Sequence, residues 1–250
     1  MPKSTGLLGR KKNSSSTTRP FKDFYATWIE SLRSTHLPDL HHSIPASSSS
    51  TSTSLSSSVA SLHSHFSSYF SALDLAASHD PSQLLSPTHL RTSLELPFLF
   101  LGDFHPSLFT ILLRSLLQET RRFPKPSRDL LSKLDQIERG LRLIVPSLVA
   151  RLGEAQTAFA EAAAVEWASS RGKQMKEADA DGAIGARVEA LAAVFLDANR
   201  LRRSVLDEII AALGVYQAAL YLEKLAKFVL KISDPAIAME FEQCQTRPPR

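Results

Sequence analysis

The chain has 250 residues and a formal net charge of +4 at pH 7, and its 43% hydrophobic residues are enough to form a sizeable core. Only 9 residues are glycine, while alanine and leucine are abundant, which favours helices over sheets. The single cysteine, Cys244, excludes an intramolecular disulfide and a cysteine-based metal site. We find neither a signal peptide nor an apolar run of about 18–20 residues, so we predict neither secretion nor a membrane span.

The positive charge is concentrated near the N-terminus. Residues 1–19 contain five lysines and arginines, including Lys11 and Lys12, and no acidic residue, so the rest of the chain has a net charge of −1. We predict that residues 1–19 form a disordered basic arm, and that the remainder is not a basic nucleic-acid surface. Lys11 and Lys12 predict a weak attraction of this arm to anionic lipid.

Apolar side chains recur at helical spacing over most of residues 20–244, which predicts one helical domain followed by a tail at 245–250. The Ser/Thr tract at 45–58 cannot bury enough apolar surface to offset the entropy of ordering, and we predict a disordered linker there. A connection containing glycine and aspartate is predicted at 170–185, and no segment shows the alternation of a strand. The predicted helices begin near Pro20, with Pro38 kinking or ending the first one, and then cover 55–78, 87–94, 106–117, 127–169, 186–231 and 235–243.

Two long helices dominate the C-terminal half of this prediction. Each has roughly 40 residues, which gives a length of about 60 Å at 1.5 Å per residue. Pro146 predicts a kink in the first of them, and Gly214 a bend in the second. We therefore predict an all-α fold, an elongated helical bundle with two long, kinked C-terminal helices.

The connection after the first long helix partly matches a calcium-binding loop. If Glu177 is the first position, Asp179 and Asp181 fall at the third and fifth. The twelfth position, which should be a bidentate glutamate, is Val188, so a polar turn between two helices is the favoured interpretation. The 8 histidines show no metal-binding spacing, and we predict neither a metal nor a cofactor.

Asp103 and His105 lie close together in the string GDFHPS, and such a pair can orient a catalytic base. No nucleophile or second carboxylate accompanies them, so we predict that the chain is not an enzyme. Asp103 is expected to cap or turn the chain before the helix that opens at Pro106, and His105 to be a hydrogen-bonded packing residue.

Two other groups of residues are candidates for structural or interaction roles. Trp28 belongs to an aromatic stripe, which predicts a position in the core. Arg200 and Arg202, beside Asp197, allow two interpretations: an interface cluster, or a charged helix face with i,i+4 ion pairs.

Four segments occur in an order that resembles one plant domain family. They are FKDFYATWIESL, LFLGDFHPSLFTILL, VEALAAVFLDANRLRRSVLDEI and VYQAALYLEKLAKFV, within residues 20–232. They resemble motifs of the seed-dormancy-control domain, which is shared by delay-of-germination proteins and the C-terminal half of TGA-type bZIP factors. The string GDFHPS and the inserted serine tract look most like the inaperturate-pollen branch of this family.

This resemblance implies a non-enzymatic adaptor that specifies pollen aperture sites through protein–protein interaction at plasma-membrane domains, on the cytoplasmic side. The alternative that it implies is a nuclear transcription co-regulator that works with TGA-type factors. No basic region with leucine heptads precedes residue 20, so we expect no direct sequence-specific DNA binding. The expected partners are aperture factors or TGA-type factors, and a homo-oligomer is compatible with both roles. The candidate interaction or structural residues are Trp28, Gly102, Asp103, His105, Pro106, Arg200, Arg202 and Gln217.

Overall fold

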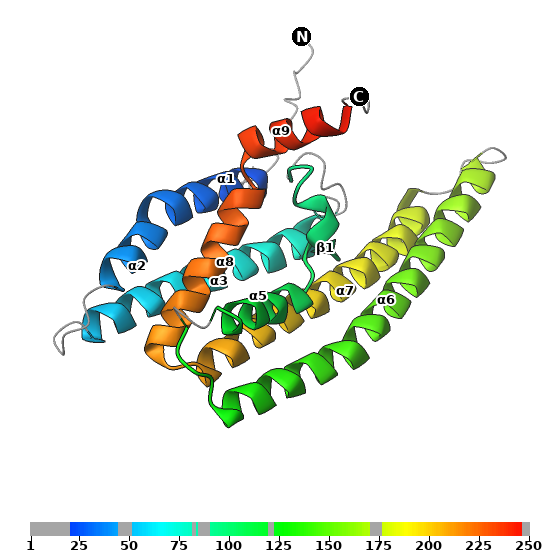
Figure 1. The fold of residues 1–250 in the computed structure, drawn as a ribbon. Coiled ribbons are helices and arrows are strands. Elements are labelled where there is room, and N and C mark those ends of the chain that lie inside the picture. The colour runs from blue at the N-terminus through cyan, green and yellow to red at the C-terminus, as the bar shows by residue number, and fades with distance from the viewer. Residues whose placement is uncertain are drawn as a thin grey trace, which may run out of the picture.

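The computed structural model describes residues 21–44, 52–81, 84, 91–119, 123–170 and 177–246, and it confirms the all-α fold (Figure 1). The predicted basic arm at 1–19 and most of the predicted tail lie outside these residues. No helix within the described ranges is both long and apolar enough to cross a membrane. The elements in chain order are α1 (Phe21–Ser31), the π-helix η1 (Leu32–His36), α2 (Leu37–Ser43), α3 (Ser52–His79), the 3-10 helix η3 (Leu96–Phe98), β1 (Leu99–Phe100), β2 (Asp103–Phe104), α5 (Ser107–Leu117), α6 (Arg128–Ser170), α7 (Glu177–Ala212), α8 (Val215–Ile232) and α9 (Pro235–Thr246). The two strands are antiparallel and pair Leu99 with Phe104 and Phe100 with Asp103.

Two segments that we predicted to be irregular are helical. Helix α3 begins at Ser52, so residues 52–58 of the predicted linker are helical, while 45–51 lie outside the described residues. Helix α7 begins at Glu177, so the prediction of a connection is wrong over 177–185, and a calcium loop and a polar turn are both excluded there. Serine, glycine and aspartate are poor helix formers, and continuation into the neighbouring helical turns outweighs that preference in both segments.

The N-terminal helix continues through Pro38 and is not ended by it. Because proline has no N–H, Pro38 cannot donate to the carbonyl of Ser34, and the π-helical turn η1 ends at His36, two residues before it. The predicted short helix at 87–94 is not seen where it can be checked, since residues 91–94 form a bend and a turn and the others lie outside the described residues.

Helix α8 packs against α2, α3 and α5 and lies inside the bundle (Figure 1). All residues from Ala218 to Glu223 are buried, and six consecutive residues cover the whole circumference of a helix. The predicted helix at 186–231 is therefore two helices. Gly214 has extended backbone between α7 and α8, and the side chain of Gln217 accepts a hydrogen bond from its N–H at 3.2 Å, which caps α8.

Helices α6 and α7 form a long antiparallel pair whose far end extends away from the rest of the molecule (Figure 1). Pro146 lies inside α6, and the helix bends along its length, as expected for an internal proline. Among the described side chains, none on α6 after Leu148 and none on α7 before Leu191 is buried. The far half of this pair therefore contributes little to the core.

The aromatic stripe of α1 packs in the core against α3, as predicted for Trp28. The indole Nε1 of Trp28 donates to the carbonyl of His65 at 2.9 Å, and Nε2 of His65 donates to the carbonyl of Trp28 at 3.1 Å. Their rings are stacked, with centroids 4.8 Å apart, and the ring of His36 lies 4.1 Å from that of His65. Burial, together with repulsion from His36, lowers the pKa of His65 to about 4.

This pKa predicts that acid destabilises the fold. An unfolded histidine takes up its proton near pH 6.5, whereas folded His65 does so only near pH 4, so the unfolded state binds more protons within that interval and stability falls as the pH is lowered through it. Allowing for the partial exposure of the ring, the loss attributable to His65 is about 1 kcal/mol. Urea unfolding at pH values across the interval will measure it. His65→Gln should reduce the dependence, whereas His79→Gln, which alters an exposed histidine of the same helix, should not.

Candidate functional site

The string GDFHPS begins inside the β1–β2 hairpin. The turn residues Leu101 and Gly102 have φ angles of 47° and 82°, the left-handed region that glycine adopts readily and other residues rarely. A Cβ atom added at position 102 would lie 3.1 Å from the Cβ of Leu84. Gly102 is therefore required by the backbone of the turn and by the close approach of Leu84.

The guanidinium of Arg202, from α7, is inserted into this hairpin, and the residue is only 1% exposed. Its Nε donates to the carbonyl of Phe104 at 2.7 Å. Its Nη2 donates to the carbonyls of Leu101 at 3.0 Å, Asp103 at 3.2 Å and Phe100. Burial lowers the pKa of Arg202, but an arginine keeps its proton in proteins. One buried cation thus connects α7 to both strands.

A second buried arginine, Arg91, lies on the other side of Asp103. It donates to Oδ1 of Asp103 at 2.9 Å, to Oε1 of Glu95 at 3.0 Å and to the hydroxyl of Tyr69 at 2.6 Å. The hydroxyl of Tyr69 donates to Asp103 at 2.7 Å, and that of Tyr25 donates to Glu95 at 2.7 Å. The network of Arg91, Glu95, Asp103 and Arg202 therefore contains two cations and two carboxylates, and its formal charges cancel.

The protonation states in this network suit its hydrogen bonds. Burial raises the pKa of Tyr69 and of Tyr25, so both phenols keep their protons and donate to carboxylates. Burial opposes the charge of Arg91, but the surrounding oxygen atoms of the two tyrosines and two carboxylates outweigh it, and the pKa of Arg91 is raised. The four charged groups are buried and bonded to one another, although Oδ2 of Asp103 has no hydrogen-bond partner among the described residues. The arrangement suits stabilisation of the hairpin.

His105, and not Asp103, caps the helix that follows. Its Nδ1 accepts a hydrogen bond from the backbone N–H of Ser107 at 3.1 Å, at the first turn of α5. Because Nδ1 is the acceptor, the neutral ring carries its proton on Nε2. Burial and the charge of Arg202 lower the pKa of His105, which favours this neutral form. Pro106 is buried directly before α5, as expected for a residue that opens a helix.

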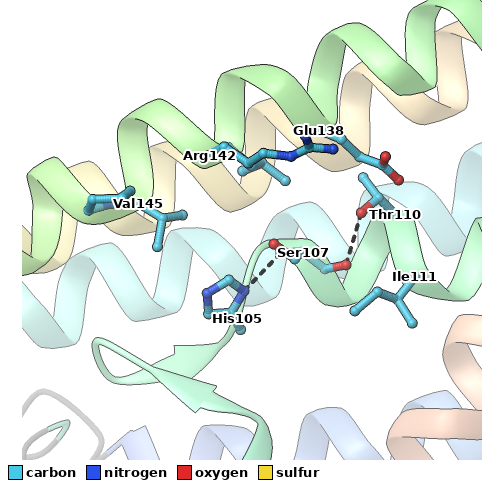
Figure 2. Close-up of a pocket in the computed structure, with 9 residues that line it drawn as sticks. His105, Ser107, Thr110, Ile111, Glu138, Arg142 and Val145 are labelled. Atoms are coloured by element: carbon cyan, nitrogen blue, oxygen red, sulfur yellow. Dashed lines mark hydrogen bonds between the residues drawn. The ribbon is translucent and has the colours of Figure 1, made fainter.

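An open cavity of about 470 Å³ lies beside His105, between the first turns of α5 and the middle of α6 (Figure 2). Glu138 on its α6 side accepts two hydrogen bonds from Arg114, at 2.8 and 2.9 Å. Arg142 is exposed and forms no ion pair with another described residue. The lining residues are His105, Ser107, Thr110, Ile111, Glu138, Leu141, Arg142, Val145 and Pro146.

The structure brings only some of the predicted residues together. Gly102, Asp103, His105, Pro106 and Arg202 meet at the hairpin, whereas Trp28, Arg200 and Gln217 lie elsewhere. Arg200 is 74% exposed in its side chain and pairs with Asp197 at 2.7 Å, an i,i+3 pair on the helix surface. For Arg202 both earlier interpretations are wrong, because the residue lies neither on an interface nor on a charged helix face.

Sequence reasoning missed Arg91 and Glu95. The signal was present, since Glu95 interrupts the most apolar stretch of the chain and Arg91 precedes it by four residues. A charged residue in such a stretch is either at the surface or paired inside, and here it is paired. Across the described part of the chain, no three His, Cys, Asp or Glu side chains are grouped closely enough to hold a metal ion.

The sequence of this chain is similar to those of a known family and of two named proteins. The profile of the seed dormancy control family matches residues 36–115, which include the hairpin and most of α5. The chain is 43% identical to the protein Inaperturate pollen 1 homolog of Oryza sativa subsp. japonica over 252 aligned positions, covering 99% of each chain. It is 37% identical to the protein Inaperturate pollen1 of Arabidopsis thaliana, covering 94% of this chain and 96% of the relative. Neither the family nor the relatives are named as enzymes.

Replacing Arg202 with methionine should destabilise the protein strongly. Methionine is of similar length but leaves four carbonyls without their donor and the charge of Asp103 less well balanced, which costs about 3–5 kcal/mol. Arg200→Met removes a neighbouring exposed arginine and should change stability by less than about 0.5 kcal/mol. Urea denaturation of the two variants measures the contrast, and equal losses would contradict the assigned role of Arg202.

Two glycine substitutions should have opposite effects on the free energy of unfolding. Gly102→Ala places a Cβ atom against Leu84 at a positive φ, and we expect a loss of about 1–2 kcal/mol. Gly140→Ala, in the interior of α6 with nothing within 4 Å, should gain about 0.5–1 kcal/mol from higher helix propensity. Thermal unfolding of both variants provides the test.

Proposed function

The chain belongs to the inaperturate-pollen family, and on this basis we propose that it is a non-enzymatic adaptor that helps to specify pollen apertures at domains of the plasma membrane. The observation that carries the proposal is the match along almost the whole length of two relatives whose names refer to pollen without apertures. A match of that extent spans the segments that form the hairpin and both long helices, so the similarity is not confined to one motif.

The buried network supports a role in binding rather than in chemistry. The charged groups at the hairpin are occupied with one another, and the residues available to a partner are those on the outer surfaces of the helices. An adaptor needs a rigid scaffold with accessible faces, and the buried ion pairs make this scaffold rigid.

The basic arm supports the placement at a membrane. Each of Lys11 and Lys12 near an anionic surface contributes about 1 kcal/mol. The whole arm carries five such charges, which gives an attraction that is weak and sensitive to salt. We infer that a protein partner holds the adaptor at specific domains, while the arm favours the membrane over the cytosol.

Disruption of the gene in the plant that encodes this chain tests the proposal. We expect pollen grains without apertures, and we expect a fluorescent fusion of the full chain to restore the apertures and to gather at discrete domains of the plasma membrane in microscopy. A fusion without residues 1–19 should fold normally and be retained less strongly at the membrane.

Each result bears on a different part of the proposal. Normal apertures in the disrupted line would contradict a role in aperture formation. Restored apertures with fluorescence confined to the nucleus would contradict the adaptor at the membrane and favour a transcription co-regulator.

A further inference from the structure

The cavity beside His105 exists because α5 is too short to cover α6. Helix α5 has 11 residues, or about 16 Å at 1.5 Å per residue, whereas α6 has 43. Along α6 the lining residues recur at intervals of three and four, so they occupy one face of the helix. Across the gap, Ile111 of α5 is 59% exposed, which leaves an apolar wall open to solvent (Figure 2).

Arg142 is the one lining residue of this cavity whose charge no described acid pairs with. Both carboxylate oxygens of Glu138 are bound by Arg114, which also pairs with Asp135 at 2.5 Å, so two acids share this one arginine. Arg142 and Arg139, one turn apart on the same helix, have no ion-pair partner among the described residues. An exposed cation such as Arg142, which lines the cavity opposite the apolar Ile111, is complementary to a carboxylate that is carried on an apolar surface.

Two further groups in the cavity can form hydrogen bonds. His105 presents Nε2–H, because its Nδ1 is used by the backbone of Ser107. Pro146 has no N–H, so the carbonyl of Arg142 lacks the donor that it would normally have four residues later. The cavity thus offers donors for a carboxylate and an acceptor for an amide, next to aliphatic side chains.

We propose that this cavity is the docking site for an acidic amphipathic segment of a protein partner, in which a carboxylate binds Arg142 and aliphatic side chains contact Ile111, Val145 and Pro146. The open shape favours a protein segment over a small molecule, because small-molecule sites bury most of their ligand and the wall at Ile111 stays exposed. The proposal rests on the adaptor function and identifies the surface that would serve it.

The test uses the full-length protein and a short fluorescein-labelled helical peptide with a leucine face bordered by glutamates. A control peptide has glutamine in place of every glutamate. Fluorescence anisotropy measures the binding of each peptide. We expect the acidic peptide to bind, the glutamine peptide to bind at least about tenfold more weakly, and added salt to weaken the binding of the acidic peptide. The backbone amide shifts that change in NMR spectra should lie in the first turns of α5 and the middle of α6.

Three variants locate the site. Arg142→Glu should weaken binding at least about tenfold, and Ile111→Ser should weaken it as well. Both residues are exposed, so neither change should alter the melting temperature. Arg187→Glu makes the same charge change at an exposed position of α7 away from the cavity and should bind like the unmodified chain.

Several outcomes would overturn the proposal: no binding of the acidic peptide, equal binding of the two peptides, equal effects of the two charge reversals, or shifts confined to other helices. Its failure can be told apart from failure of the adaptor role. Peptide binding is measured on purified protein, whereas the adaptor role is decided by the apertures of the disrupted line.

Discussion

The buried guanidinium of Arg202 is the interaction on which the rest of the site depends. Moving an arginine out of water is costly unless its donors and its charge are satisfied, and here four carbonyls and the nearby Asp103 satisfy them. Asp103 in turn needs Arg91, and Arg91 is balanced by Glu95. Because each charge requires the next, α3, α7 and the hairpin are held in one arrangement, and that arrangement places His105 and the first turn of α5 beside α6.

The helices could largely be predicted from the sequence, since apolar spacing at three and four residues reports on local structure. The boundaries of α5, α6 and α9 follow from it closely. The errors arose where a segment's own propensity disagreed with its surroundings: glycine and aspartate around Asp181 indicate a turn, yet α7 is helical there. Gly214 indicated a bend, and the side chain of Gln217 made it a complete break between two helices.

The site was less predictable, because it depends on contacts between residues that are distant in the chain. Gly102, Asp103 and His105 could be identified together since they are adjacent. Arg202 lies about a hundred residues further on, in a run with the exposed Arg200 and the half-buried Arg203, and no local pattern distinguishes the fully buried arginine from the other two. Arg202 differs from the other two arginines because the carbonyls of the hairpin contact it, and only the folded structure brings them together.

The far half of the α6–α7 pair has a different physical character from this network. Beyond Leu148 the two helices are stabilised by their own hydrogen bonds and by half-buried contacts with each other, so each turn depends only on its neighbours. A change in the length of this part would therefore leave the contacts around Arg202 unchanged. The protein combines a part in which every charge depends on its neighbours, around Arg202, with a part in which each helical turn depends only on the turns beside it.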